Sequence, residues 1–127
     1  MPQPAPQNPN SRLNPVRLRF PRAARILARP DFVRALEHGR RASDSRLAVW
    51  IIANDLPCAR LGLNVGRRYG DAPDRNHFKR LLREAFRLQR RMLPAGYDIV
   101  CAPRGRGPMT CRDAVESLAK LVSRALQ

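Results

Sequence analysis

Acidic residues are scarce in this sequence. Of its 127 residues, 25 are Lys or Arg and only 10 are Asp or Glu, which gives a formal net charge of +15 at pH 7. Self-repulsion at this charge disfavours a compact state, so a polyanionic partner is the natural explanation. Nucleic acid is the first candidate for that partner, and an anionic membrane surface is the second.

Lysine is scarce as well, since Lys79 and Lys120 are the only two. The other basic residues are arginines, whose planar guanidinium suits bidentate contacts with phosphates and stacking on bases. Codon usage in a GC-rich genome also favours arginine, and the two explanations are compatible.

Residues typical of protein active sites are lacking. The ten carboxylates are scattered, and nothing pairs His38 with His77, so the sequence indicates neither a catalytic metal cluster nor an acid–base pair. Cys58, Cys101 and Cys111 have no CxxC spacing, so no zinc site is indicated, and we expect reduced thiols in a cytoplasmic protein. A Gly-rich phosphate loop and a GxSxG motif are also missing. These absences favour a binding protein without catalytic residues of its own.

No apolar run approaches the roughly eighteen residues of a membrane span. The N-terminus also lacks the basic segment followed by an apolar segment that is typical of a signal peptide. Residues 1–16 are rich in Pro, Gln and Asn and show no apolar period, so we expect a disordered N-terminal extension. Residues 17–127 are long enough for one modest core and too short for two. They are expected to form a single domain that binds nucleic acid.

Apolar periodicity predicts six elements. Helical periods cover 30–38, 75–91 and 110–126, and β-rich runs cover 46–54, 60–68 and 97–103. We expect the first two strands to form a hairpin with a longer loop, Asp74 to cap the second helix, and Thr110 with Asp113 to form a capping box. Gly62 and Gly66 leave one side of the second strand bare, which permits close approach of another group. The order α-β-β-α-β-α indicates an α+β fold, an α/β sandwich with a central sheet.

The predicted helix at 75–91 holds seven Arg and Lys residues against one carboxylate, Glu84. Like charges four residues apart destabilise a helix by a few tenths of a kcal/mol per pair, so such a ridge is reasonable where phosphates neutralise it. A merely solvated basic face is the alternative. The ridge consists of Arg75, Lys79, Arg83 and Arg87, and Arg80, Arg90 and Arg91 lie beside it. The opposite side of the helix is expected to be a buried stripe of Phe78, Leu81, Leu82, Ala85, Phe86 and Leu88.

Other residues near this helix are compatible with two roles each. Arg67 and Arg68, just before the helix, add positive charge to the same region. Asn76 either satisfies backbone groups locally or contacts a base or ribose edge. Phe32 and Trp50 either pack as ordinary core or stack on unpaired bases.

Four segments resemble the protein subunit of bacterial ribonuclease P. RNHFKRLLREAFR is similar to the family's Arg-Asn-Arg motif helix, and RLGLNVGRRYG to its Arg-(Val/Leu)-Gly-Leu-Ser-Val-Ser-Lys-Lys strand. PDFVRALEHGRR and YDIVCAPR resemble the family's Asp-Phe-x-x-Val-Phe-x-x-Gly segment and Tyr-Asp-Ile-Val strand. The resemblance covers about residues 17 to 126.

The resemblance implies that an RNA subunit is the catalyst and removes the 5′ leader of precursor tRNA, while the protein binds that RNA and the leader. It implies Mg²⁺ held mainly by the RNA, no cofactor bound by the protein alone, no DNA or membrane partner, and one protein per catalytic RNA. The fold it implies has a left-handed βαβ crossover, against the usual hand. The expected leader-binding residues are Phe32, Leu36 and Trp50, and the expected RNA-binding residues are Arg67, Arg68, Arg75, Asn76, His77, Lys79, Arg80, Arg83 and Arg87.

The chain departs from the family pattern at four positions. Leu36 occupies a position in the leader-binding cleft that is often aromatic in the family. His77 replaces the second Arg of the motif, which removes a fixed charge unless a nearby phosphate raises the pKa of the imidazole. Asn64 and Gly66 replace two serines of the family strand. Two other classes of function remain as alternatives: a nuclease that acts without RNA, for which no carboxylate cluster is visible, and a ribosomal or other structural nucleic-acid-binding protein.

Overall fold

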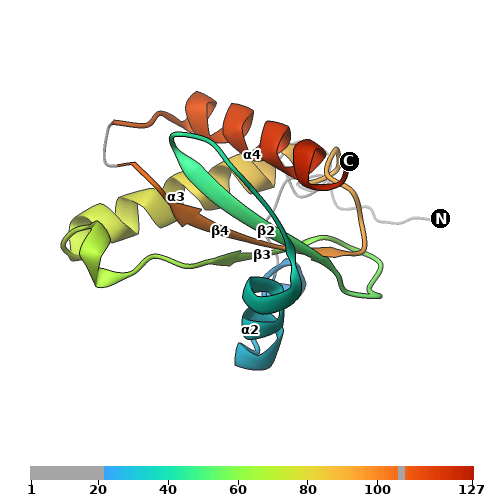
Figure 1. Ribbon diagram of the computed structural model, residues 1–127. Helices are drawn as coiled ribbons and strands as arrows, with labels where there is room; N and C mark the ends of the chain where they lie inside the picture. Colours follow the sequence, from blue (N-terminus) through green and yellow to red (C-terminus); the bar gives the residue numbers. More distant parts are fainter. Residues whose placement is uncertain (1–21, 106–107) are drawn as a thin grey trace, which may run out of the picture.

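The computed structural model describes residues 22–105 and 108–127, which form a four-stranded sheet between helices (Figure 1). The expected N-terminal extension at 1–16 lies outside the described residues, as does the start of the predicted domain at residue 17. The α+β fold class is confirmed. The elements are the short 3₁₀ turn η2 (Arg22–Ala24), α2 (Arg29–His38), β1 (Arg40–Ser43), β2 (Leu47–Ala53), β3 (Arg60–Leu63), the 3₁₀ turn η3 (Arg67–Tyr69), α3 (Ala72–Gln89), β4 (Tyr97–Pro103) and α4 (Cys111–Ala125).

The sheet has the order β1-β2-β4-β3, so the prediction of a hairpin between 46–54 and 60–68 is wrong. β4 lies between β2 and β3, antiparallel to the first and parallel to the second. Ile99, Val100 and Cys101 are all fully buried, which means that β4 is apolar on both faces. Such a strand is stabilised most in the centre of a sheet, where both backbone edges find partners. β3 and β4 are the parallel pair joined through α3, as expected for the βαβ unit; the left hand of this crossover stays a prediction.

β1 was not predicted from the sequence, because Arg40–Ser43 is short and polar. It forms the hairpin partner of β2, in register from Arg40 opposite Ile51 to Ser43 opposite Ala48. The predicted second strand is shorter than expected, since β3 ends at Leu63 and Arg67 and Arg68 belong to η3.

The main core lies on the face of the sheet that α3 and α4 cover (Figure 1). β2 contributes Leu47, Val49 and Ile51 to this core by the two-residue alternation of a strand. The predicted stripe of α3 is largely confirmed, but Leu88 is 43% exposed while its neighbour Gln89 is buried and donates from Nε2 to Val115 O at 3.2 Å. Cys101 is part of this core, and burial raises the pKa of its thiol to about 12.

α2 lies across the opposite face and covers only part of it (Figure 1). A small cluster forms there around the buried residues Ile26, Ala35 and Val100. The rest of this face has no helix over it among the described residues. That asymmetry leaves a hollow beside α2.

Helix ends follow the expected side-chain chemistry with one correction. Asp71, not Asp74, is the N-cap of α3, and its Oδ1 accepts a hydrogen bond from the Asp74 N–H at 3.1 Å. The helix therefore begins at Ala72, one turn earlier than predicted. The capping box of α4 is confirmed: Thr110 Oγ1 accepts from Asp113 N–H and Asp113 Oδ2 accepts from Thr110 N–H, both at 3.1 Å. Among the helices of the described ranges, none has the length and apolar content needed to cross a membrane.

The β1–β2 turn is held by the carboxylate of Asp44. Its Oδ1 accepts hydrogen bonds from the N–H groups of Arg46 (2.8 Å) and Leu47 (2.9 Å), and Lys120 Nζ of α4 lies 3.1 Å from Oδ2. Burial works to raise the pKa of Asp44, but these hydrogen bonds outweigh it and lower the pKa to about 2. The charged carboxylate therefore stabilises the fold, and this contribution is present above the unfolded pKa near 4 and is lost as pH falls to about 2.

We predict that Asp44→Asn lowers the free energy of unfolding more at pH 6 than at pH 2. The difference from the wild type should grow by about 1–2 kcal/mol over that range, because Asn keeps an acceptor but cannot ionise. Thermal or urea unfolding at several pH values measures this. Asp55→Asn removes the same charge from an exposed loop residue and is the matched control. A wild-type–variant difference that does not change with pH would contradict the prediction.

Candidate nucleic-acid interface

The exposed side of α3 carries the expected basic residues. Asn76, Arg80, Arg83 and Arg87 line one hollow of about 410 Å³ on this side of the helix, and Lys79 lies on the flank toward β3. No carboxylate of residues 22–105 or 108–127 forms an ion pair with Lys79, Arg80 or Arg83. We call the side chains of Arg75, Asn76, Lys79, Arg80, Arg83 and Arg87 the basic surface.

Two members of the basic surface also have partners within the protein. Arg75 donates from Nη1 to the carbonyl of Gly70 at 2.7 Å, which fixes its guanidinium at the start of α3. Arg87 forms two hydrogen bonds with Glu84, Nε to Oε1 at 3.0 Å and Nη2 to Oε2 at 2.5 Å. This pairing raises the pKa of Arg87 and lowers the pKa of Glu84. Arg87 is thus the member of the surface whose charge is most compensated.

Arg25 lies in the same hollow and was not identified from the sequence. It belongs to the segment between η2 and α2, which runs alongside β3: Arg25 forms a parallel bridge with Leu61, and Ile26 N–H donates to Leu61 O at 3.0 Å. This segment is too short to show a period, so only the tertiary fold could bring Arg25 to α3.

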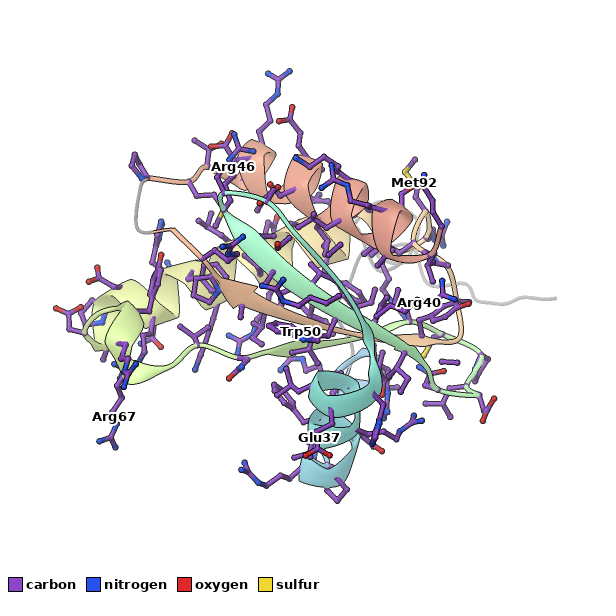
Figure 2. The ribbon with its side chains drawn as sticks, viewed as in Figure 1. Glu37, Arg40, Arg46, Trp50, Arg67 and Met92 are labelled. Carbon is purple, nitrogen blue, oxygen red and sulfur yellow. The ribbon has the colours of Figure 1, made fainter. Side chains whose placement is uncertain are left out.

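The other expected RNA-binding residues lie nearby but outside this hollow. His77 is exposed on α3, and Arg67 projects away from the turn before the helix (Figure 2). Arg68 lines a separate hollow of about 270 Å³ with Asn64, Gly66 and Arg104, beyond the end of β3. Arg104, like Arg25, was not predicted from the sequence.

The three predicted leader-binding residues come together on the sheet face that α2 partly covers. Phe32, Leu36 and Trp50 are all half-buried and pack against the cluster of Ile26, Ala35 and Val100. We call this group of three side chains the aromatic cleft. Phe32 and Trp50 thus pack partly as core, as one interpretation expects, and their stacking on unpaired bases stays a prediction.

Backbone approach and charge shape this cleft further. The ring of Phe32 rests on Gly62 of β3, where an added Cβ would lie 2.8 Å from Phe32 Cε2. The bare side of the strand thus accommodates Phe32. The guanidinium of Arg41, which is opposite Trp50 in the β1–β2 register, lies 5.5 Å from the centre of the Trp50 ring. A cation and a π-face therefore lie next to each other at Trp50.

The family model for ribonuclease P matches residues 20–126. The chain belongs to the ribonuclease P protein family. The ribonuclease P protein component of Syntrophobacter fumaroxidans is 40% identical over 102 residues, which cover 79% of this chain and 86% of that protein. The protein component of Chlamydia felis is 33% identical over 109 residues, with 85% and 78% covered.

Solved structures of ribonuclease P proteins share the fold. The protein from Thermotoga maritima has a TM-score of 0.72 at 31% identity, covering 79% of this chain and 96% of that chain. The protein from Staphylococcus aureus has a TM-score of 0.71 at 27% identity, covering 82% and 96%.

Membership in the ribonuclease P protein family gives the function. The chain is a subunit of an RNA-catalysed endoribonuclease and acts in the processing of tRNA 5′ ends, with ribonuclease P RNA and a tRNA substrate as partners. The alternative of a ribosomal or other structural binder is not favoured. Within the two described ranges, no three His, Cys, Asp or Glu side chains form a group that could hold a metal ion.

Proposed function

We propose that the basic surface of α3 binds the catalytic RNA, while the aromatic cleft holds the single-stranded 5′ leader of precursor tRNA. The observation that carries this proposal is the clustering of Lys79, Arg80 and Arg83 on one side of α3, where none of the three forms an ion pair with a carboxylate of the described residues. Phosphates of a folded RNA supply the missing negative charge. Arg67, Arg68 and His77 flank this surface and extend the contact.

The aromatic cleft suits a different kind of ligand. Single-stranded RNA exposes base faces, and these stack on aromatic rings and on guanidinium planes. Trp50 with Arg41 offers an aromatic face and a guanidinium, and Phe32 beside Leu36 offers a second aromatic ring. In a duplex the base faces are stacked on one another and are not available to these side chains. A leader strand fits this cleft better than a helical RNA does.

Three further points belong to the proposal. The Mg²⁺ ions of the reaction are held mainly by the RNA, and the protein alone binds no cofactor. One protein associates with each catalytic RNA, with no DNA or membrane partner. The complex works in the cytoplasm, where precursor tRNA is made.

Replacing Trp50 tests the assignment of the cleft. We expect Trp50→Ala to weaken binding of a leader-bearing precursor tRNA to the reconstituted holoenzyme by roughly fivefold to tenfold. This factor corresponds to the low end of the free energy for stacking one base on an aromatic side chain. Binding of mature tRNA should not change. The measurement is the dissociation constant of each substrate, with cleavage by RNA alone, protein alone and both together at low magnesium.

Two control variants accompany this experiment. Trp50→Phe keeps an aromatic face and is expected to retain most of the leader affinity, whereas Ile52→Ala perturbs the same small cluster without removing a stacking surface. Equal losses for precursor and mature tRNA would refute the cleft assignment. Cleavage by the protein alone would refute the division of labour with the RNA.

A further inference from the structure

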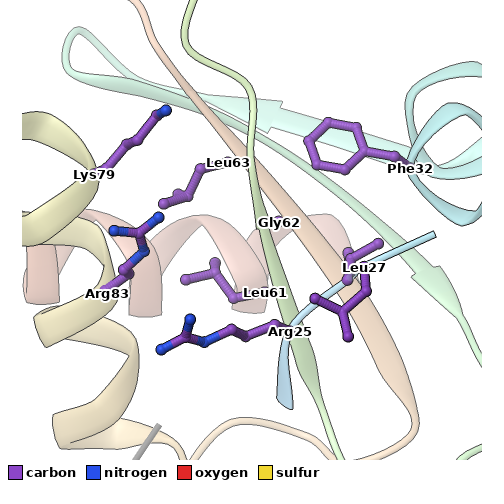
Figure 3. A pocket seen from close by; sticks show the side chains of 9 residues that line it. Arg25, Leu27, Phe32, Leu61, Gly62, Leu63, Lys79 and Arg83 are labelled. Carbon is purple, nitrogen blue, oxygen red and sulfur yellow. The ribbon is translucent and has the colours of Figure 1, made fainter. Parts of the chain in front are cut away.

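A hollow of about 260 Å³ lies across β3 and joins the two surfaces described above (Figure 3). On one side of the strand it is lined by the side chains of Arg25, Lys79 and Arg83. On the other side it is lined by Phe32 and Leu27. The hollow therefore has a cationic end and an apolar, aromatic end.

The cationic end gathers charge from two distant parts of the chain. Lys79 and Arg83 come from successive turns of α3, and Arg25 comes from the segment before α2 (Figure 3). Among the residues that the structure describes, no carboxylate lines this hollow. Three cations around one cavity repel one another, and a bound anion removes that repulsion.

The position of Arg25 is fixed by its backbone. Its bridge to Leu61 and the hydrogen bond from Ile26 N–H to Leu61 O at 3.0 Å tie this segment to β3. A cation held on a fixed segment is better placed to bind a phosphate than one on a free chain end, because less conformational entropy is lost on binding.

Gly62 lies between the two ends of the hollow. The space beside its backbone is filled by the ring of Phe32, whose Cε2 lies 2.8 Å from the place of an added Cβ, so the aromatic end of the hollow is held directly against β3. Leu61 and Leu63 also line the hollow, and their side chains lie on the side of β3 that faces Lys79 and Arg83 (Figure 3). A single nucleotide matches these two ends, because its charged phosphate suits the cationic end and its apolar base face suits the aromatic end.

We propose that this hollow is a phosphate subsite for the 5′ leader. A leader phosphodiester binds to Arg25, Lys79 and Arg83 while the adjacent base lies against Phe32. This inference rests on the proposed role of the aromatic cleft, and it places Lys79 and Arg83 at the border between the leader and the catalytic RNA. It also gives Arg25, which neither periodicity nor family resemblance identified, a role in substrate binding.

Neutral phosphates in the leader test this subsite. Methylphosphonate linkages are introduced one at a time into the leader of a precursor tRNA, and each substrate is bound to the reconstituted holoenzyme. We expect one position at which the substitution weakens binding by roughly fivefold to tenfold, as for loss of a charged hydrogen bond to a partly exposed group. In Arg25→Gln and in Lys79→Gln the same substitution should have little further effect, because the partner of that phosphate is already missing.

The salt dependence provides an independent measurement. Each variant should reduce the slope of log affinity against log salt concentration by about 0.7 for the leader-bearing substrate, as expected for one single-stranded phosphate contact. Arg112→Gln is the matched control, since its side chain is 88% exposed on α4 and does not line the hollow, and its removal changes the net charge equally.

Three results would overturn the subsite. They are an absence of any sensitive leader phosphate, a sensitive phosphate whose effect is unchanged in both variants, and variants that weaken leader-bearing and leaderless substrates equally. The last result would assign the cations to the catalytic RNA alone. If Trp50→Ala still weakens only leader-bearing substrates in the same assay, the cleft stands and only the phosphate subsite fails.

Discussion

A double replacement on α3, Arg75→Gln with Arg80→Gln, is expected to weaken binding of the protein to the catalytic RNA by about a hundredfold. Arg80 is exposed without an ion-pair partner among the described residues, and Arg75 is aimed by its hydrogen bond to Gly70 O. Hydrogen bonds to charged groups contribute about 1.5–3 kcal/mol each, and the lower value for two contacts gives this factor. The salt slope should fall by about 1.8, because each contact with a duplex phosphate contributes about 0.9.

The matched control for this variant removes the same charge elsewhere. Arg112→Gln with Arg124→Gln acts on exposed positions of α4, on a helix that lines neither hollow of the basic surface. The control should change RNA affinity by less than threefold or so, through the long-range field alone. Equal losses in the two double variants would mean that net charge, not the arrangement on α3, determines binding. Circular dichroism of both proteins checks that the helices persist.

The sequence predicted α3 well because its two sides differ so strongly. Phe78, Leu82, Ala85 and Phe86 repeat at the helical period and are all buried, as expected of an amphipathic helix. The early start of the helix was missed, since Asp71 and Asp74 are both good caps and only the structure distinguishes them.

Sheet topology could not be read from neighbouring segments. β2 and β3 are consecutive strands, but β4 pairs with both and separates them, because its residues are buried on both faces. β1 escaped prediction for the opposite reason: Arg40–Ser43 has almost no apolar pattern, and its pairing with β2 provides the structure.

Some residues of the candidate site could be predicted from local sequence, and others are brought there only by the tertiary fold. The members of the basic surface are neighbours on one helix and were predicted from spacing. Phe32, Leu36 and Trp50 were expected together only through family resemblance, and the fold brings them into one cluster. Arg25 and Arg104 come to the interface through tertiary contacts alone, and no local pattern marks them.

A buried ion pair at the start of β4 is expected to dominate stability. Asp98 is fully buried, and its carboxylate accepts from Arg60 Nε and Nη2, both at 2.7 Å, and from Asn54 Nδ2 at 2.9 Å. The hydrogen bonds that Arg60 donates to Asp98 raise the pKa of Arg60, whose side chain is only 15% exposed. We predict that Asp98→Ala lowers the free energy of unfolding by about 3–5 kcal/mol, because it leaves the Arg60 charge buried without its main partner. Urea unfolding monitored by Trp50 fluorescence measures this.

Replacing both partners separates the cost of a broken pair from the value of the pair. Arg60→Met with Asp98→Leu should recover most of the lost stability, since no desolvated charge then remains. Arg60 Nη2 also lies 3.3 Å from Asp31 Oδ2 in the first turn of α2, so the pair connects this helix to the sheet beneath it. The double variant is therefore expected to fold but to bind leader-bearing substrates a few-fold more weakly, because Phe32 is no longer held in place by that connection. A loss below about 1 kcal/mol for Asp98→Ala would show that solvent already screens these charges. The inference that Asp98 and Arg60 hold α2 and Phe32 in place would then be contradicted.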